Sequence, residues 1–209
     1  TNIVISQPAS GLAFTSETVS NFNGFGISCF GEDDGSVSLV ISGGTPPYTY
    51  NWTASNSTDL STINSPDLNA LAPGDYTVVV TDSTGSCDIS ATYSITQPTD
   101  MVLTGTTSNY NGFEVSGFGL DDGSIDLTVA GGIDSQLYTY LWSASNGGII
   151  PTGQDDDEDL SGLTKGTYTV VVTDDNGCTE TISFTLTEPN ELIATEAIAQ
   201  HQNVDCFGD

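Results

Sequence analysis

The residues best suited to chemistry are aspartates that stand beside glycines or end a strand-like run. Two Asp-Asp-Gly sequences lie 88 residues apart, and two identical Tyr-Thr-Val-Val-Val-Thr-Asp sequences each end on an aspartate. These aspartates are Asp33, Asp34, Asp82, Asp121, Asp122 and Asp174. Carboxylate oxygens on tight turns are ligands that calcium prefers, so the sequence predicts calcium sites here, although none of the turns matches the EF-hand loop. The competing interpretation is that Asp-Gly turns only cap and solvate strand ends.

Four cysteines allow three pairing rules. A bond within one repeat, Cys29–Cys87, leaves Cys178 without a partner, because Gly117 stands at the position equivalent to Cys29. A bond from Cys178 to Cys206 leaves Cys87 unpaired. A bond from Cys29 to Cys178 would join neighbouring repeats. Loop-closure entropy does not choose between Cys29–Cys87 and Cys29–Cys178, so both stay open.

Catalytic motifs are missing from the sequence. The only histidine is His201, and there is no nucleophile elbow, no phosphate-binding loop and no Cys/His set with zinc spacing. Pairs of carboxylates are plentiful, but they recur with the repeat, as structural residues do. The sequence therefore predicts that the chain is not an enzyme and requires no cofactor.

The net charge is −27, from 28 acidic residues and one basic residue, Lys165. Nucleic acid and anionic membrane are excluded as partners, because their phosphates would find no cations to pair with. No apolar run is long enough to span a bilayer. The acidic run from Asp155 to Asp159 is predicted to be a solvated loop. A composition with 36% hydrophobic residues is nevertheless that of a folded protein.

The element that must position these turns is a strand that occurs twice, at residues 76–82 and 168–174. Its β-branched residues favour a strand, and alternation places Tyr76, Val78 and Val80 on one face. A Leu-x-x-Gly-x-Tyr sequence leads into each copy and resembles the tyrosine corner of immunoglobulin-like sandwiches. The rest of each repeat is expected to pack on this strand.

Aromatic residues define a second strand in each repeat. Tyr48, Tyr50 and Trp52 are two residues apart, as are Tyr138, Tyr140 and Trp142. This spacing predicts an inward aromatic face with the tryptophan in the core, in preference to an exposed sugar-binding platform. The predicted core residues are Trp52, Tyr76, Trp142 and Tyr168. Asn23-Gly24 and Asn111-Gly112 are expected to form hairpin turns, the first after an extended segment from Leu12 to Phe22.

Matched landmarks set the length of the repeat. Cys29 aligns with Gly117 at an offset of 88 residues, and Tyr76 aligns with Tyr168 at an offset of 92. A period of about 90 residues suits independent sandwiches in tandem. We expect an all-β chain of immunoglobulin-like or fibronectin-III-like sandwiches. The expected units are the last strand of a preceding repeat (1–8), two full repeats (9–98 and 99–189) and the start of a third repeat (190–209).

Four ordered motifs, three of them recognisable in both repeats, carry a family resemblance. They read Cys-Phe-Gly-x-Asp-Asp-Gly-Ser, Gly-Gly-x-Pro-Pro-Tyr-x-Tyr-x-Trp, Leu-x-x-Gly-x-Tyr-x-Val-x-Val-x-Asp and Ile-Thr-Gln-Pro. They resemble the SprB repeat of very large surface adhesins of the Bacteroidetes, which include a gliding-motility adhesin. Gly117 and an inserted Ser86 depart from the pattern. The resemblance implies an extracellular filament on the surface of a Gram-negative bacterium, exported by the type IX secretion system.

Two hypotheses for function follow from the repeats and the resemblance. The first is a structural and adhesive stalk repeat of a secreted cell-surface adhesin, with roles in surface attachment and gliding motility. The alternative is a glycan- or calcium-binding module that presents its variable loops to a ligand. The expected partners are neighbouring repeats of the same chain, a surface polysaccharide or other substratum, and the gliding or secretion machinery, without nucleic acid or membrane insertion.

Overall fold

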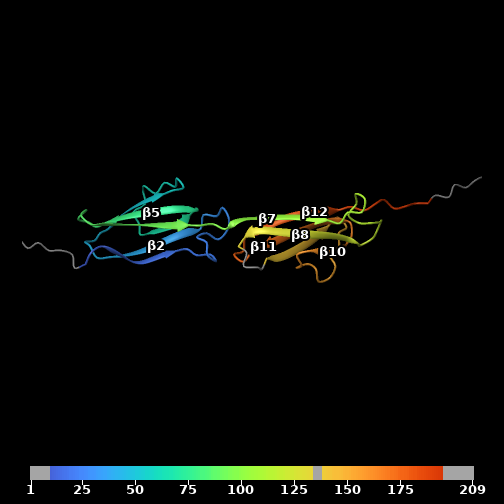
Figure 1. The fold of residues 1–209 in the computed structure, drawn as a ribbon, viewed down its shortest axis with the longest axis horizontal. Helices are drawn as coiled ribbons and strands as arrows, with labels where there is room; N and C mark the ends of the chain where they lie inside the picture. Colours follow the sequence, from blue (N-terminus) through green and yellow to red (C-terminus); the bar gives the residue numbers. More distant parts are fainter. Residues whose placement is uncertain (1–9, 134–137, 195–209) are drawn as a thin grey trace, which may run out of the picture.

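The computed structural model describes residues 10–133 and 138–194, and the regular structure there consists of β-strands. Figure 1 shows two layered units placed end to end along the long axis of the molecule. The first sandwich contains β1 (Ala13–Val19), β2 (Gly35–Ser42), β3 (Thr49–Ala54), β4 (Asp67–Leu71), β5 (Gly74–Thr81) and β6 (Asp88–Ile95). The second sandwich contains β7 (Thr99–Thr107), β8 (Gly123–Gly132), β9 (Thr139–Ser145), β10 (Leu160–Leu163), β11 (Gly166–Thr173) and β12 (Thr179–Leu186). No helix long and apolar enough to cross a bilayer occurs in the described ranges.

Each sandwich is made of two antiparallel three-stranded sheets with the same topology. The first sandwich pairs its strands in the orders β1-β2-β4 and β3-β5-β6, and the second in the orders β7-β8-β10 and β9-β11-β12. The predicted all-β tandem of immunoglobulin-like sandwiches is confirmed. The predicted unit limits at residues 9, 98 and 189 stay predictions, and the fragments predicted at 1–8 and 195–209 lie outside the described residues.

The central strands β5 and β11 are the strands that the repeated sequence predicted. Tyr76, Val78 and Val80 have 0% exposed surface, and the residues between them are only half-buried. The hydroxyl group of Tyr76 donates to the carbonyl oxygen of Ala72 at 2.8 Å, and that of Tyr168 donates to the carbonyl oxygen of Thr164 at 2.8 Å. A tyrosine corner therefore ties the start of each central strand to the turn before it.

The two tryptophans lie in the cores, as their spacing predicted. Trp52 is opposite Val78 in the β3–β5 register and Trp142 is opposite Val170 in the β9–β11 register, and both indoles are buried. Each indole N–H donates to a backbone carbonyl oxygen at 2.9 Å, that of Ser65 for Trp52 and that of Asp157 for Trp142. The indole nitrogens are thus satisfied inside the protein.

The Asn23-Gly24 turn forms, but the hairpin around it is shorter than predicted. Both residues have positive φ (50° and 99°), and Phe22 and Phe25 exchange backbone hydrogen bonds of 2.8 and 3.1 Å. Strand β1 has already ended at Val19. After the turn, the N–H groups of Gly26 and Ile27 both donate to the carbonyl oxygen of Thr96. The segment after the turn therefore packs against the end of β6, because its N–H groups bond to Thr96 and not to residues of β1.

Strands β4 and β10 are short edge strands that the sequence patterns did not reveal. Each buries two leucines three residues apart, Leu68 with Leu71 and Leu160 with Leu163. Alternation would separate inward residues by two, but one residue with positive φ (Ala70 at 54°, Gly162 at 69°) interrupts each strand. The register of both pairings shifts at this point. Such a bulge brings the second leucine back to the inner face.

Candidate functional site

The exposed aspartates of the two Asp-Asp-Gly turns act as backbone caps. The carboxylate of Asp34 accepts a hydrogen bond from the N–H of Ser28 at 2.9 Å. Asp122 accepts the same bond from Ser116 at 2.9 Å and also accepts from the Ser116 hydroxyl group. The bonds from Ser116, led by that of its side chain, hold the pKa of Asp122 below its usual value. Each carboxylate therefore closes the loop that carries the preceding cysteine or glycine.

Asp82 and Asp174 are buried at the ends of the two central strands, with 3% and 5% of their surface exposed. Asp82 accepts from the Thr84 hydroxyl group at 2.6 Å and from the N–H groups of Thr84 and Thr45. The Thr84 hydroxyl bond is the largest cause that lowers the pKa of Asp82, against the opposing effect of burial. Both carboxylates are buried as hydrogen-bond acceptors, and this satisfies them without a cation.

The six aspartates predicted as calcium ligands are not brought together. Asp33 and Asp121 are exposed. The other four carboxylates accept hydrogen bonds from backbone or hydroxyl donors, which for Asp174 are the N–H groups of Ile133, Asn176 and Cys178. In the two described ranges, no three His, Cys, Asp or Glu side chains are grouped so that they could hold a metal ion. Calcium binding therefore stays a prediction.

A disulfide bond joins the two sandwiches. Cys29 follows the first hairpin turn and Cys178 precedes β12, and their sulfur atoms are bonded with the Cα atoms 5.7 Å apart. This is the pairing between neighbouring repeats, one of the two alternatives that the sequence left open. Cys206 lies outside the described residues. Cys87, the residue equivalent to Cys178, is a free and exposed thiol.

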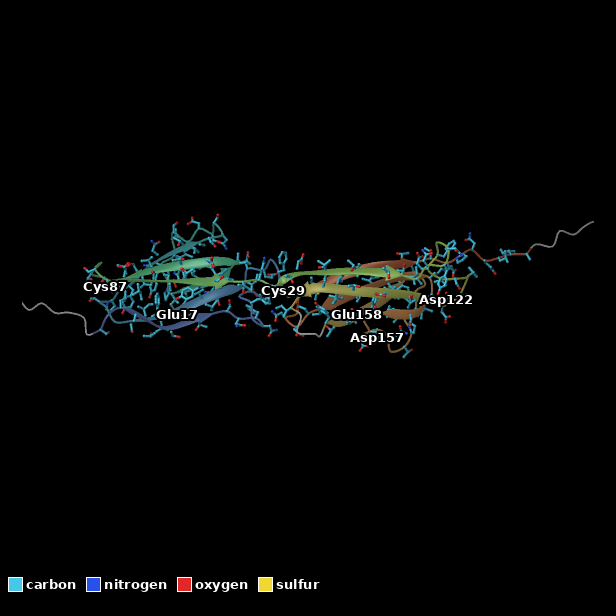
Figure 2. All side chains as sticks on the ribbon, in the orientation of Figure 1. Glu17, Cys29, Cys87, Asp122, Asp157 and Glu158 are labelled. Carbon is cyan, nitrogen blue, oxygen red and sulfur yellow. A yellow bond between two sulfur atoms is a disulfide. The ribbon has the colours of Figure 1, made fainter. Side chains whose placement is uncertain are left out.

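Hydrogen bonds across the junction surround the disulfide. The side-chain N–H of Asn176 donates to the carbonyl oxygen of Ser28 at 2.9 Å, and Asn23 donates to the side-chain oxygen of Asn176 at 2.6 Å. Cys29, Phe30 and Glu32 of the first sandwich line a cleft with Asp174, Cys178 and neighbouring residues of the second. Figure 2 places Cys29 at this junction and Cys87 at the far tip of the first sandwich. The junction is therefore held by both covalent and polar contacts.

Lys165, the only lysine or arginine in the chain, is used at the opposite end of the second sandwich. Its ammonium group pairs with Glu188 and lies 5.3 Å from the centroid of the Phe118 ring. Glu188 also accepts from the N–H of Gly119 at 2.7 Å. The hydrogen bond from Lys165 is the main cause that lowers the pKa of Glu188. In the first sandwich the neutral Gln97 accepts the equivalent bond from Gly31 at 3.1 Å.

The acidic run from Asp155 to Asp159 keeps its side chains exposed, as predicted for a solvated loop. Figure 2 shows Asp157 and Glu158 on the outside of the second sandwich. The backbone of the run nevertheless holds Trp142, because the carbonyl oxygen of Asp155 accepts its backbone N–H at 3.0 Å and that of Asp157 accepts its indole N–H. Burial, followed by the charge of Glu158, raises the pKa of Tyr140 to about 12.

Comparison with known protein families finds a match in each sandwich. Residues 27–57 and 114–147 match the family model of the SprB repeat. Each sandwich therefore contains a segment that matches the SprB repeat. In the first sandwich the SprB match includes the junction cysteine Cys29 and runs through β2 and β3; in the second it includes Gly117. No curated protein matches the chain.

Three solved structures are among those to which this chain is similar. The three N-terminal domains of the outer capsid protein Hoc of bacteriophage RB49 are 21% identical with a TM-score of 0.43; the match covers 83% of this chain and 59% of that chain. A C-terminal 282-residue fragment of intimin, bound to the intimin-binding domain of its translocated receptor, is 21% identical with a TM-score of 0.39, over 83% and 64%. Extracellular domains 3–5 of Drosophila OTK are 16% identical with a TM-score of 0.31, over 85% and 61%. The chain thus spans less than two thirds of each of these structures.

Two features of the structure were absent from the sequence predictions. Asn176 reaches across to Ser28, whereas the equivalent Thr84 turns its hydroxyl group back to Asp82. The pairing of Lys165 with Phe118 was also missed. The signal available in the sequence was the set of positions at which the two matched repeats differ. Asn176 stands at the position equivalent to Thr84, and Lys165 at the position equivalent to Pro73.

Proposed function

We propose that the chain is a structural and adhesive stalk segment of a large secreted cell-surface adhesin. The proposed location is the extracellular face of a Gram-negative cell, with export by the type IX system and roles in surface attachment and gliding motility. The proposed partners are neighbouring repeats, a surface polysaccharide or other substratum, and the gliding or secretion machinery. SprB repeats and immunoglobulin-like sandwiches are non-catalytic domain types, so we propose no enzymatic activity.

The observation that carries this proposal is the covalent link between two sandwiches arranged end to end. The Cys29–Cys178 bond and the contacts of Asn176 join the ends of the two units that meet at the junction. This favours a stiff linear arrangement. Stiff units joined in line hold the two ends of an adhesin far apart, whereas a flexible linker of the same length has a shorter average end-to-end distance. A strongly negative surface also keeps such filaments apart from one another.

Solution scattering and glycan binding together test the stalk proposal. The oxidised chain is expected to scatter as a rod, with a maximum dimension set by two sandwiches in line, and to give no saturable signal on a glycan array. Saturable glycan binding that substitutions in the variable loops 56–66 or 146–159 abolish would instead support the binding-module alternative. A compact particle, with the two units folded back on each other, would contradict the stalk.

A further inference from the structure

We infer that the Cys29–Cys178 disulfide carries tension across the junction and removes almost all of both sandwiches from the path of the force. The inference rests on the proposed function, because a stalk is pulled at its two ends. Its physical basis is the connectivity of the chain, since the bond joins residues separated by 149 positions in the sequence.

Two covalent routes connect the sandwiches. The peptide route leaves β6 at Ile95 and enters β7 at Thr99. The disulfide route leaves the chain at Cys29, after β1, and rejoins it at Cys178, one residue before β12 begins. Tension applied at the two ends therefore passes through β1, the disulfide and β12. The strands from β2 to β11 all lie inside the loop that the disulfide closes.

This loop withholds a large length of chain from extension. At about 3.6 Å for each extended residue, a loop of this size would add about 500 Å if it unravelled between free ends. With the disulfide intact it adds no length, because the two ends of the loop remain joined. Unfolding of the strands inside the loop then produces no extension of the stalk. Tension does not act directly on these strands, because the disulfide bypasses them.

The segments that remain in the path of the force are edge strands. β1 pairs only with β2, and β12 pairs only with β11. Tension is expected to peel β1 and β12 from their neighbours first, and the extension then stops at the disulfide. The bond is also fixed from both sides in the folded protein, because Asp34 holds Ser28 beside Cys29 and Asp174 holds Cys178. Peeling of the edges is therefore the limit of extension at this junction.

Force measurement on single molecules tests the inference directly. The full chain would be held by its two ends in optical tweezers, with Cys87→Ser and Cys206→Ser so that Cys29 and Cys178 are the only thiols. In oxidising buffer we expect extension steps shorter than about 100 Å, the length of the terminal segments. Reduction with dithiothreitol, or the further change Cys29→Ser, is expected to give two steps of about 250 Å, one for each sandwich.

Three controls keep the result interpretable. Cys178→Ser should reproduce the long steps of Cys29→Ser, and circular dichroism of each variant should retain the strand signal. Reduction of the protein that carries only Cys87→Ser and Cys206→Ser provides the same comparison without a further substitution. Steps of about 250 Å in the oxidised protein would overturn the inference. Rod shape and glycan binding are measured separately, so the stalk proposal and the force path can fail independently.

Discussion

The carboxylate of Asp174 accepts a hydrogen bond from the backbone N–H of Cys178 at 2.9 Å, and the backbone N–H of Asp174 donates to the carbonyl oxygen of Cys178 at 3.0 Å. The same carboxylate accepts from the N–H groups of Ile133 and Asn176 at 2.9 and 3.0 Å. One buried aspartate thus fixes the backbone of the cysteine that bonds to the first sandwich.

Removal of this carboxylate should destabilise the second sandwich. Asp174→Ala leaves three backbone N–H groups without their charged acceptor, and we expect the free energy of unfolding to fall by about 2–4 kcal/mol. Differential scanning calorimetry would detect this as a lower melting temperature. The matched control is Asp175→Ala, in the same turn but exposed. Equal melting temperatures for the two variants would contradict the role given to Asp174.

Opening of the disulfide should destabilise both sandwiches. In the chain-entropy account a bond between residues separated by 149 positions is worth about 5 kcal/mol, because it restricts the unfolded chain. For units of this size that corresponds to a decrease of about 10 °C or more in melting temperature. The measurement compares oxidised protein, reduced protein and Cys29→Ser. Unchanged melting after verified reduction would show that the bond does not constrain the unfolded state.

The tyrosine corners should each contribute through one buried hydroxyl group. Tyr76→Phe and Tyr168→Phe remove the bonds to Ala72 and Thr164, and we expect each change to cost about 1–3 kcal/mol. Tyr110→Phe is the control, since its hydroxyl group bonds to Asp122 on the exposed surface. Chemical denaturation should place this control within about 0.5 kcal/mol of the parent protein. A control as damaging as the corner variants would refute the assignment.

Acid should destabilise the protein through carboxylates whose pKa is lowered by folding. Hydrogen bonds from Thr187, its hydroxyl group first, lower the pKa of Glu114. A group with a lower pKa in the folded state stabilises it above its unfolded pKa, and this contribution is lost as the pH falls through the folded value. We therefore expect the melting temperature to fall from about pH 5 to about pH 3.

Substitution of Glu114 identifies one source of this acid sensitivity. Glu114→Gln should lower the melting temperature at neutral pH and reduce the further loss in acid, because glutamine has no proton to gain. Glu191→Gln, at an exposed position, is the control and should follow the parent protein at every pH. A Glu114→Gln variant with the full acid-dependent loss would exclude this carboxylate as a source.

Chelation should leave the stability unchanged. In the described ranges four of the six predicted calcium ligands accept internal hydrogen bonds, and Asp33 and Asp121 are exposed to solvent, so no cation is needed to satisfy them. Melting temperatures would be compared in chelator, in calcium and in sodium chloride of equal ionic strength, because salt alone screens the net charge of −27. A rise with calcium that sodium does not reproduce and chelator reverses would establish a calcium site.

The core and the central strands were predictable because their signals are local. Alternation of Tyr76, Val78 and Val80 specifies one face of a strand, and the position of Trp52 two residues after Tyr50 does the same for the facing strand. Strands β4 and β10 escaped this reasoning because a residue with positive φ breaks their alternation. No local sequence pattern predicts a residue with positive φ at this position. This applies particularly to Ala70, because alanine rarely adopts positive φ.

The functional junction was only partly predictable, because its contacts join residues far apart in the sequence. Cys29 and Cys178 were recognised as a candidate pair, but loop length alone did not distinguish this pairing from Cys29–Cys87. The choice depends on the end-to-end placement of the two sandwiches, which brings the Cα atoms of Cys29 and Cys178 to 5.7 Å. The contact of Asn176 with Ser28 depends on the same placement.

Peptide mapping without reduction tests the covalently linked tandem most directly. Protein produced under oxidising conditions would be alkylated, cleaved with a protease specific for acidic residues and analysed by mass spectrometry. The structure predicts a linked pair of peptides that contain Cys29 and Cys178, with Cys87 alkylated. A linked pair that contains Cys29 and Cys87 would contradict the bond between the sandwiches, and with it the path of force through the junction.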